Sequence, residues 1–276
     1  MILTESMLNS KITLNNGIEL PILGLGTWEL KRNDCLQAVK WALEAGYRHI
    51  DTATLYGNEK QVGIAIKESG IPREEIFITT KVWDSDQGYE KTLTALDKSL
   101  NNLDTSYVNL YLIHWPRELR NETWRAMENL LDEGKVWAIG VSNFSIHHID
   151  DIIDNSSTIP AVNQIQITPF NYKRDLIDYC KNNQIAVEAY SPLTHGKQLN
   201  NPKLISIAQK YEKSTAQVLI RWGLEHNFIE IPRSRSEKHI YENIDVFDFS
   251  LSDDDMTFLD NLHEPFHILF DTNDWK

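Results

Sequence analysis

The sequence predicts an α/β protein of one domain, a closed (β/α)8 barrel covering residues 1–276. Eight short apolar runs rich in β-branched residues alternate with longer segments of helical period, which is typical of parallel strands joined by helical crossovers. These runs are evenly spaced, and the composition does not change along the chain as it would at a domain boundary. The length of 276 residues is also close to the roughly 250 residues of such barrels.

The first predicted element is a β-hairpin ahead of the barrel. Residues 11–14 and 18–20 flank Asn15-Asn16-Gly17, and Asn-Gly is a strong signal for a tight turn between two strands. Because it precedes the first barrel strand, we expect this hairpin to plug the bottom of the barrel.

The eight predicted barrel strands follow in order, and each ends at a turn or a polar residue. They cover residues 22–25, 47–50, 76–79, 108–113, 136–141, 161–165, 185–189 and 228–231. The helical segments between them include residues 34–45, 59–68, 89–101, 124–133 and 214–222. Gly46, Gly70 and Gly134 are placed to end three of these segments as helix C-caps.

An open, doubly wound sheet would produce the same alternation of strands and helices. Such sheets bind dinucleotides through a turn with three glycines that opens a helix. The segment Gly24-Leu-Gly26-Thr-Trp-Glu29 lacks the third glycine and opens no helix, so the closed barrel is favoured.

The last predicted helix begins after Ser252, whose hydroxyl is suited to an N-cap, and the acidic residues 253–255 favour the same helix end. Beyond Leu262, the tail of residues 263–276 is apolar in its middle. Two arrangements remain open for it: Phe266, Phe270 or Trp275 covers a pocket, or the tail packs on the outside of the barrel.

Composition and charge exclude several classes of protein. With 41% hydrophobic and 24% charged residues the chain resembles ordinary globular proteins, which argues against disorder. The formal net charge of −13 repels phosphate backbones and anionic lipids, so neither a nucleic-acid nor a membrane partner is expected. The first residues lack the pattern of a signal peptide, which predicts a cytoplasmic protein. Cys35 and Cys180 are expected to be packed free thiols.

Polar residues stand at the ends of the predicted strands. In a (β/α)8 barrel these positions meet at the C-terminal face, where the active site lies. The residues at these positions are Asp51, Lys81, His114, Ser142, Asn143, Gln164, Tyr190, Ser191, Arg233 and Ser234. We therefore expect side chains from distant parts of the sequence to line one pocket.

Four residues of this region suggest a specific chemistry. A lysine ammonium near a tyrosine lowers the pKa of the phenol, which makes the tyrosine a better proton donor near neutral pH. Lys81 can provide that charge, Asp51 can pair with Lys81, and Tyr56 follows Asp51 closely enough to turn back over the barrel mouth. His114 could hydrogen-bond a substrate oxygen.

At these residues the sequence resembles the aldo-keto reductase family over nearly its whole length, and it is most similar to the short bacterial-type members. The resemblance rests on several motifs in order: Gly24-Leu-Gly26-Thr27-Trp28, residues 46–59 with Asp51 and Tyr56, Thr80-Lys81-Val-Trp83, Ile113-His114-Trp115-Pro116, Gly140-Val-Ser142-Asn143-Phe144, Val162-Asn-Gln164, Ala189-Tyr190-Ser191-Pro192-Leu193 and Ile231-Pro-Arg233-Ser234. Each motif alone is weak evidence, but their combination is specific.

The resemblance implies an NADP(H)-dependent reductase that converts aldehydes or ketones, including α-dicarbonyls or keto sugars, to alcohols. The Asp, Tyr, Lys and His of the family's catalytic tetrad correspond here to Asp51, Tyr56, Lys81 and His114. The family mechanism implies hydride transfer to the carbonyl carbon while Tyr56 protonates the oxygen as general acid.

The resemblance also implies a set of cofactor contacts. Tyr190 would stack on the nicotinamide ring, and Ser142, Asn143 and Gln164 would hold its carboxamide. The cofactor channel would be lined by Gly26, Thr27, Trp28, Ser191 and Leu193.

The adenosine end departs from the family pattern. The family usually has Lys at the position of Arg233 and Arg at the position of His239, both near the 2′-phosphate. Arg233 keeps the charge, but a histidine is mostly neutral at pH 7, so the preference for NADPH would be weakened. Ser234 and Arg235 belong to the same cluster, and Glu242 and Asn243 match the adenine contacts. We expect a preference for NADPH over NADH.

For the substrate pocket, Trp28, Trp83 and Trp115 match family positions that form apolar walls beside His114. The substrate is expected to be a small carbonyl compound and the protein a monomer. No metal site is predicted, because the side chains of His147 and His148 are adjacent and diverge on a helix.

Two other functions remain open. A strand-end lysine such as Lys81 can form a Schiff base in a barrel lyase when its pKa is lowered, although Asp51 favours the ammonium form. Alternatively, the barrel could bind the cofactor to sense its redox state without physiological turnover.

Overall fold

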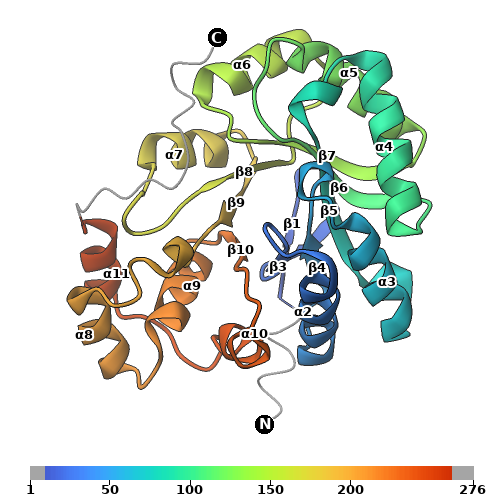
Figure 1. Cartoon of the computed structure of the whole chain (residues 1–276). Coiled ribbons are helices and arrows are strands. Elements are labelled where there is room, and N and C mark those ends of the chain that lie inside the picture. The colour runs from blue at the N-terminus through green and yellow to red at the C-terminus, as the bar shows by residue number, and fades with distance from the viewer. Residues whose placement is uncertain (1–9, 263–276) are drawn as a thin grey trace.

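The computed structural model describes residues 10–262 and shows a barrel of eight parallel strands surrounded by helices (Figure 1). The order of the strands, β3 to β10, is their order along the chain. The first and last strands also meet: the amide of Gly24 donates to the carbonyl of Glu230 at 2.8 Å, and the amide of Glu230 donates to Ile22 O at 2.8 Å. The predicted (β/α)8 barrel is confirmed.

The barrel strands have the following bounds: β3 Leu25–Gly26, β4 His49–Asp51, β5 Phe77–Val82, β6 Val108–Ile113, β7 Val136–Ser142, β8 Val162–Gln166, β9 Ala186–Tyr190 and β10 Ile229–Ile231. Most of them end one to three residues later than the sequence predicts. Four predicted site residues therefore lie at the C-terminal ends of the strands and not in the loops that follow: Asp51, Lys81, Ser142 and Tyr190. Hydrogen bonding to neighbouring strands holds their backbone, which makes their positions rigid.

Gly26 lies at the seam where the barrel closes. Its amide donates to Pro232 O at 3.1 Å, and a Cβ atom on it would lie 2.7 Å from the carbonyl oxygen of Ile231. A side chain would therefore push β3 and β10 apart. The glycine is required by the close approach of two backbones and not by its own dihedral angles.

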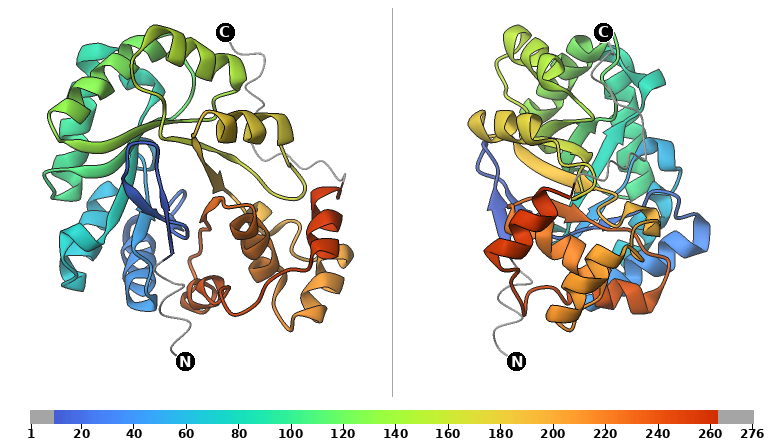
Figure 2. Two further views of the ribbon diagram at one scale, coloured as in Figure 1. Left: turned by 180° about the vertical axis from the view of Figure 1, so that it is seen from behind. Right: turned by 90° about the vertical axis from the view of Figure 1, so that its left-hand side faces the viewer.

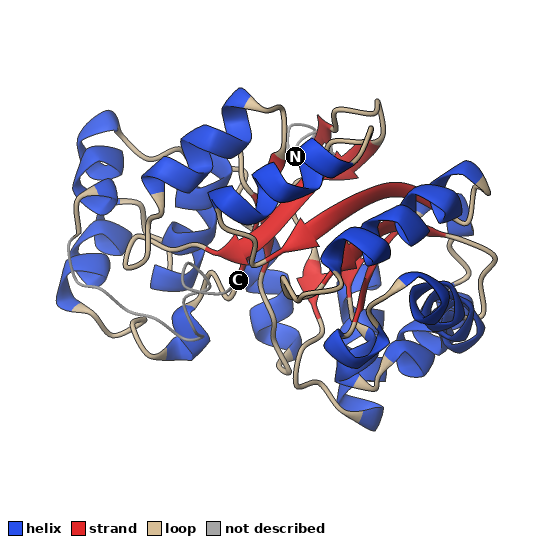
Figure 3. Cartoon of the chain, turned by 90° about the horizontal axis from the view of Figure 1, so that it is seen from above, coloured by secondary structure: helices blue, strands red, loops and turns tan. Residues whose placement is uncertain are grey.

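The helices form an outer layer around the strands (Figure 3). They are α2 Arg32–Ala45, α3 Glu59–Ser69, α4 Tyr89–Leu103, α5 Arg120–Asp132, α6 Ile146–Asn155, α7 Arg174–Asn182, α8 Pro202–Lys210, α9 Thr215–Glu225, α10 Glu237–Ile244 and α11 Asp253–Asp260. Gly46 and Gly70 end α2 and α3 in the left-handed conformation, as predicted, whereas Gly134 adopts it two residues beyond the end of α5, where Glu133 is the C-cap. Ser252 caps α11 by accepting from the amide of Asp255 at 3.2 Å.

The hairpin predicted ahead of the barrel consists of β1 Lys11–Thr13 and β2 Glu19–Pro21 and crosses one end of the barrel, as the left view of Figure 2 shows in dark blue. Leu14 and Leu20 pack into an apolar cluster with residues from inside the barrel, namely Phe77, Leu110, Leu112, Ala138, Ala161, Val162 and Ile229. The turn is fixed from outside, because Asn15 Nδ2 donates to Pro160 O and Asn16 Nδ2 donates to Trp137 O. The hairpin closes the bottom of the barrel.

The main hydrophobic core lies between the strands and the helix layer, where the buried faces of the helices meet the outward-facing strand residues. Its largest members include Trp124, Trp222 and Tyr111, all almost completely buried. Within residues 10–262, no helix is both long and apolar enough to cross a membrane. The tail proposed as a pocket cover, residues 263–276, lies outside the described residues.

Candidate active site

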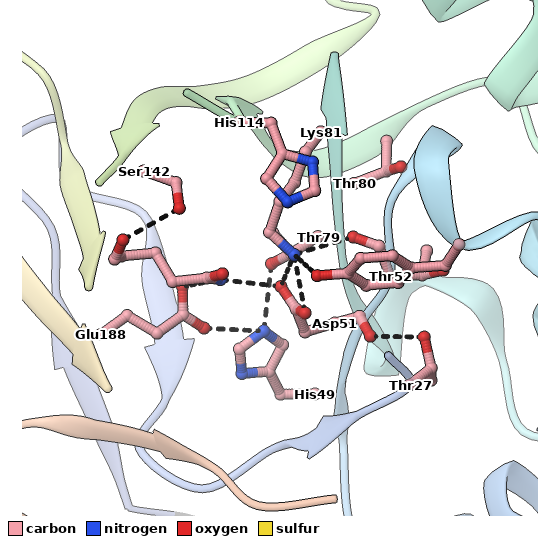
Figure 4. A network of polar contacts seen from close by, with 12 residues as sticks. Thr27, His49, Asp51, Thr52, Thr79, Thr80, Lys81, His114, Ser142 and Glu188 are labelled. Carbon is pink, nitrogen blue, oxygen red and sulfur yellow. Dashed lines mark hydrogen bonds and ion pairs between the residues drawn. The ribbon is translucent and has the colours of Figure 1, made fainter. Parts of the chain in front are cut away.

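The centre of the site is the ammonium group of Lys81, on β5 (Figure 4). Nζ donates to Oδ1 and to Oδ2 of Asp51, at 2.7 Å each, and to the carbonyl oxygen of Thr52 at 3.0 Å. Nζ also lies 3.3 Å from the phenol oxygen of Tyr56. The structure thus brings together three of the four predicted catalytic residues.

Tyr56 is carried by a short 3-10 helix, Thr54–Tyr56, directly after β4. Asn58 fixes this loop: its amide nitrogen donates to Thr27 O and Leu30 O, at 2.8 Å each, and its Oδ1 accepts from the hydroxyl of Thr52 at 2.8 Å. The hydroxyl of Thr54 donates to Lys81 O at 3.0 Å. The loop is therefore tied to the adjacent strand, and the Tyr56 ring is positioned before any ligand binds.

The lysine is charged, which fits an electrostatic role. Burial opposes the ammonium form of Lys81, but the negative charge of Asp51 and the bonds between the two groups raise the lysine pKa above its usual value. Burial also raises the pKa of Asp51, against the opposing effect of Lys81. A lysine that forms a Schiff base needs a lowered pKa, so this environment does not fit a barrel lyase.

Tyr56 differs from the sequence-based expectation in one respect. Its pKa is raised to about 12, because burial outweighs the opposing effect of the Lys81 charge. The predicted lowering of the pKa was wrong in its net direction. The phenol is protonated at neutral pH, and Lys81 still makes it a better acid than an equally buried tyrosine without a neighbouring cation.

His114 follows β6 and completes the predicted tetrad. Its ring lies 5.7 Å from the ring of Tyr56 and 5.2 Å from that of Trp83, both distances measured between centroids and both edge-to-face. Burial and the charge of Lys81 hold the pKa of His114 well below its usual range. The imidazole is therefore neutral near pH 7 and can act as a hydrogen-bonding group without adding a second positive charge.

A cavity of about 680 Å³ opens above these residues at the C-terminal ends of the strands. Most of the predicted catalytic, cofactor-binding and substrate-binding residues line it, namely Gly26, Trp28, Asp51, Tyr56, Trp83, His114, Trp115, Ser142, Asn143, Gln164, Tyr190, Ser191, Leu193, Arg233, Ser234, His239, Glu242 and Asn243. The structure thus places residues from both halves of the chain around one pocket.

Three predicted residues do not line this cavity: Thr27, Lys81 and Arg235. Thr27 lies beneath the pocket, where its hydroxyl donates to the carbonyl oxygen of Asp51 at 2.9 Å. Lys81 is fully buried behind Tyr56. Arg235 is exposed on the loop before α10. Thr27 therefore supports the site indirectly and does not form a wall of the channel.

The side chains along one wall of the cavity are joined by hydrogen bonds that run from the Tyr190 hydroxyl to the backbone carbonyl of His114. The Tyr190 hydroxyl donates to Oδ1 of Asn143 at 2.8 Å, and Nδ2 of Asn143 donates to His114 O and to the hydroxyl oxygen of Ser142, at 3.1 Å each. The Ser142 hydroxyl donates to Gln164 O at 2.9 Å. These bonds hold the Tyr190 ring at the cavity, where a flat ligand ring could stack on it.

The other end of the cavity is lined by Arg233 and His239. Arg233 lies 3.6 Å from a carboxylate oxygen of Glu29, which belongs to the loop after β3. Burial lowers the pKa of Arg233, and Glu29 opposes this. The cation is thus available to an anionic ligand, in competition with Glu29.

Several lining residues were not identified in the sequence. They are Leu55, Arg117, Pro192, His195, Gly196, Leu199, Ser214, Thr215, Ala216 and Ile231. Arg117 pairs with Asp84, its Nε 2.6 Å from the carboxylate, and the ring of His195 lies 5.1 Å from that of Trp28. Leu55, Pro192 and Ile231 lie inside a recognised motif, and Arg117 directly follows one. The other six carry no local sequence signal.

A layer of buried polar residues beneath the tetrad was also missed. Glu188 on β9 and His49 on β4 are fully buried, and Oε1 of Glu188 lies 3.5 Å from Nε2 of His49 (Figure 4). Burial, together with the charge of Lys81, lowers the pKa of His49 to about 3. The available signal was a charged residue inside the apolar strand Ala186–Tyr190.

Comparison with known proteins agrees with this geometry. The model of the Aldo/keto reductase family matches residues 22–264. Glyoxal reductase of Bacillus subtilis is 49% identical over 259 residues, which cover 93% of this chain and 94% of that protein. The 9,11-endoperoxide prostaglandin H2 reductase of Trypanosoma cruzi is 48% identical over 92% of this chain and 91% of its own length.

Solved structures show the same similarity. An aldo-keto reductase from a deep-sea metagenome library of the Medee basin superposes with a TM-score of 0.93 at 47% identity, covering 96% of this chain and 99% of that chain. An aldo-keto reductase of Bombyx mori, solved in complex with NADP, superposes with a TM-score of 0.90 at 36% identity, covering 95% of both chains.

Proposed function

Because this chain belongs to the aldo/keto reductase family, we propose that it is an NADP(H)-dependent oxidoreductase that reduces aldehydes and ketones to alcohols. The observation that carries the proposal is the contact between Lys81 and Tyr56, at 3.3 Å, with Asp51 holding the lysine from the other side. This arrangement presents one protonated phenol, with a cation beside it, to the cavity.

The residues of the cavity suit a dinucleotide. Tyr190 offers a flat aromatic face beside the tetrad, and Arg233 offers a cation at the other end of the cavity. Gln164, on β8, adds a side-chain amide to the cavity wall. Solved relatives bound to NADP and to NADPH support this assignment. When bound, the reduced cofactor supplies the hydride, and the protein supplies orientation and a proton.

In the proposed reaction, Tyr56 gives its phenolic proton to the carbonyl oxygen as the carbonyl carbon is reduced. Lys81 stabilises the negative charge left on the phenol oxygen, and Asp51 keeps Lys81 in place. His114 is neutral and can donate one hydrogen bond to the substrate oxygen, which fixes the carbonyl for proton transfer.

Three tryptophans would form the walls around a small carbonyl substrate: Trp28, Trp83 and Trp115. Water is excluded by such apolar faces, which strengthens the electrostatic interactions at the reacting oxygen. The similarity of this chain to the glyoxal reductase of Bacillus subtilis supports α-dicarbonyl compounds as its substrates. Keto sugars are the second class to test.

The remaining lining groups would contact the cofactor. Ser142, Asn143 and Gln164 would hold the carboxamide, Gly26, Trp28, Ser191 and Leu193 would line the channel, and Ser234, Glu242 and Asn243 would surround the adenosine. Thr27 would act from beneath, through Asp51. We further propose that the enzyme acts as a cytoplasmic monomer, as sedimentation analysis and cell fractionation can test.

A panel of aldehydes, α-dicarbonyls and keto sugars, assayed by NADPH oxidation, tests the proposal. Turnover with at least one class is expected. Binding of NADPH without turnover on any carbonyl would favour a barrel that only senses the redox state of the cofactor. Trapping of a substrate on Lys81 by borohydride would favour the Schiff-base lyase instead.

A further inference from the structure

The side-chain amide of Gln164 joins two buried carboxyl groups. Its Nε2 lies 2.8 Å from Oδ2 of Asp51 and 3.0 Å from Oε2 of Glu188. The three residues come from β8, β4 and β9: Gln164 and Asp51 line the cavity, whereas Glu188 does not. Glu188 itself is not exposed to solvent.

An amide nitrogen carries two hydrogens, and here each has an acceptor of its own. Both donor positions of Gln164 are therefore occupied, one by Asp51 and one by Glu188. The remaining polar atom of the side chain is Oε1, which can only accept. Since Gln164 lines the cavity, a ligand there meets it as an acceptor.

The surroundings of Glu188 fix its position and its charge. Oε1 lies 3.5 Å from Nε2 of His49, which in turn lies 3.0 Å from the hydroxyl of Thr79. The charges of Asp51 on β4 and Lys81 on β5 interact electrostatically with Glu188. Glu230 lies on the next strand, β10. Burial and the charge of Asp51 raise the pKa of Glu188 to about 8, so the group is mostly neutral at pH 7.

We propose that Glu188 is a positioning residue for the cofactor: it fixes the orientation of the Gln164 amide, so that Oε1 of Gln164 accepts a hydrogen bond from the carboxamide N–H of the nicotinamide. The inference rests on the proposed function, because it needs NADP(H) in the cavity. Glu188 does not touch the cofactor and acts only through Gln164.

Two substitutions separate orientation from packing. Glu188→Gln keeps an acceptor oxygen for the Gln164 amide, whereas Glu188→Leu removes it at similar volume. Loss of one hydrogen bond typically weakens binding by up to about tenfold. We expect the dissociation constant of NADPH to rise about fivefold to tenfold in Glu188→Leu and to stay near the wild-type value in Glu188→Gln.

The adenosine half of the cofactor provides an internal control. 2′,5′-ADP lacks the nicotinamide and should bind equally well to wild type and to Glu188→Leu. A merely structural role for Glu188 would weaken both ligands together. Equal weakening of NADPH and 2′,5′-ADP would therefore overturn the proposal.

Glu230 provides the matched variant. It is a buried glutamate on the neighbouring strand, but it faces α9: a Cβ on Gly223 would lie 1.6 Å from its Oε1. Glu230→Leu should leave the ratio of NADPH affinity to 2′,5′-ADP affinity unchanged. A change of this ratio as large as that in Glu188→Leu would also contradict the assignment.

A wild-type measurement keeps the proposal testable if Glu188→Leu does not fold. In the 3-acetylpyridine analogue of NADPH a methyl group replaces the amide nitrogen, so the ring substituent can no longer donate. Wild type should bind this analogue more weakly than NADPH, by roughly fivefold. Equal binding would overturn the acceptor role of Gln164, whereas failure of wild type to bind NADPH at all would instead overturn the proposed function.

Discussion

Nζ of Lys81 lies 2.7 Å from each carboxylate oxygen of Asp51, and both residues are almost completely removed from solvent. A buried pair of this kind is not a source of net stability, since the desolvation of both ions offsets their attraction. Its role is to hold one charge at a fixed place. The positive charge lies beside the phenol oxygen of Tyr56, which becomes negative when Tyr56 gives up its proton in the proposed reaction.

Asp51→Asn is expected to destabilise the protein by about 3–5 kcal/mol, because it leaves the Lys81 ammonium buried without a counter-ion. Urea unfolding would measure this change. The control is Asp84→Asn: its partner Arg117 is 46% exposed, so the cost should be below about 1 kcal/mol. Equal stability of Asp51→Asn and wild type would contradict the described role of the pair.

Arg233 and Glu29 should affect the preference for NADPH in opposite directions. Arg233→Met removes the cation offered to the 2′-phosphate and is expected to raise the dissociation constant of NADPH about tenfold, with little effect on NADH. Glu29→Gln removes a competing carboxylate and should tighten NADPH binding.

Fluorescence titration with both cofactors measures this preference. Arg235→Met is the control, because Arg235 is exposed and does not line the cavity. Should Arg233→Met weaken NADH as much as NADPH, the 2′-phosphate does not lie at Arg233.

The stability of the protein should depend on the ionisation of Glu188. Its pKa rises from an ordinary value of 4.5 to about 8 on folding, so the folded state retains a proton that the unfolded state releases between these values. Stability from this group is thus complete below about pH 4.5 and is lost as the pH rises through 8. Thermal unfolding of wild type and of Glu188→Gln tests this. The Tm of wild type should fall relative to that of the variant as the pH rises toward 8. Parallel plots of Tm against pH for the two proteins would contradict this contribution of Glu188.

His114 should not appear in the pH dependence of the reduction. Burial and Lys81 keep its pKa well below the ordinary value of 6.5, so the imidazole is already neutral there. We expect the kcat/KM of wild type to show no inflection near pH 6.5. An inflection that disappears in His114→Gln would show that the imidazole is charged in the free enzyme.

The fold and most of the cavity could be predicted from the sequence because local signals specify them. The alternation of strands and helices predicted the barrel, and residues at the strand ends, such as Ser142 and Gln164, had to meet at one face. The Asn-Gly turn predicted the hairpin, although its contacts with Trp137 and Pro160 depend on parts of the chain that are distant in sequence.

The properties that failed to be predicted depend on burial. The barrel strands are buried on both faces, so the pattern of β9 does not reveal that Glu188 points inward to Gln164. In the same way, the sequence shows the cation that lowers the pKa of Tyr56, but not the desolvation that outweighs it. Both effects require the distances between residues on different strands.

The central claim is that Tyr56 donates the proton during carbonyl reduction. The most direct test is the kcat of NADPH oxidation with the best aldehyde or dicarbonyl substrate, compared between wild type and Tyr56→Phe, with Tyr89→Phe, which does not line the cavity, as control. We predict a fall of about 10²–10⁴-fold in Tyr56→Phe with unchanged NADPH binding. A kcat in Tyr56→Phe equal to that of wild type would contradict the role of Tyr56 as proton donor.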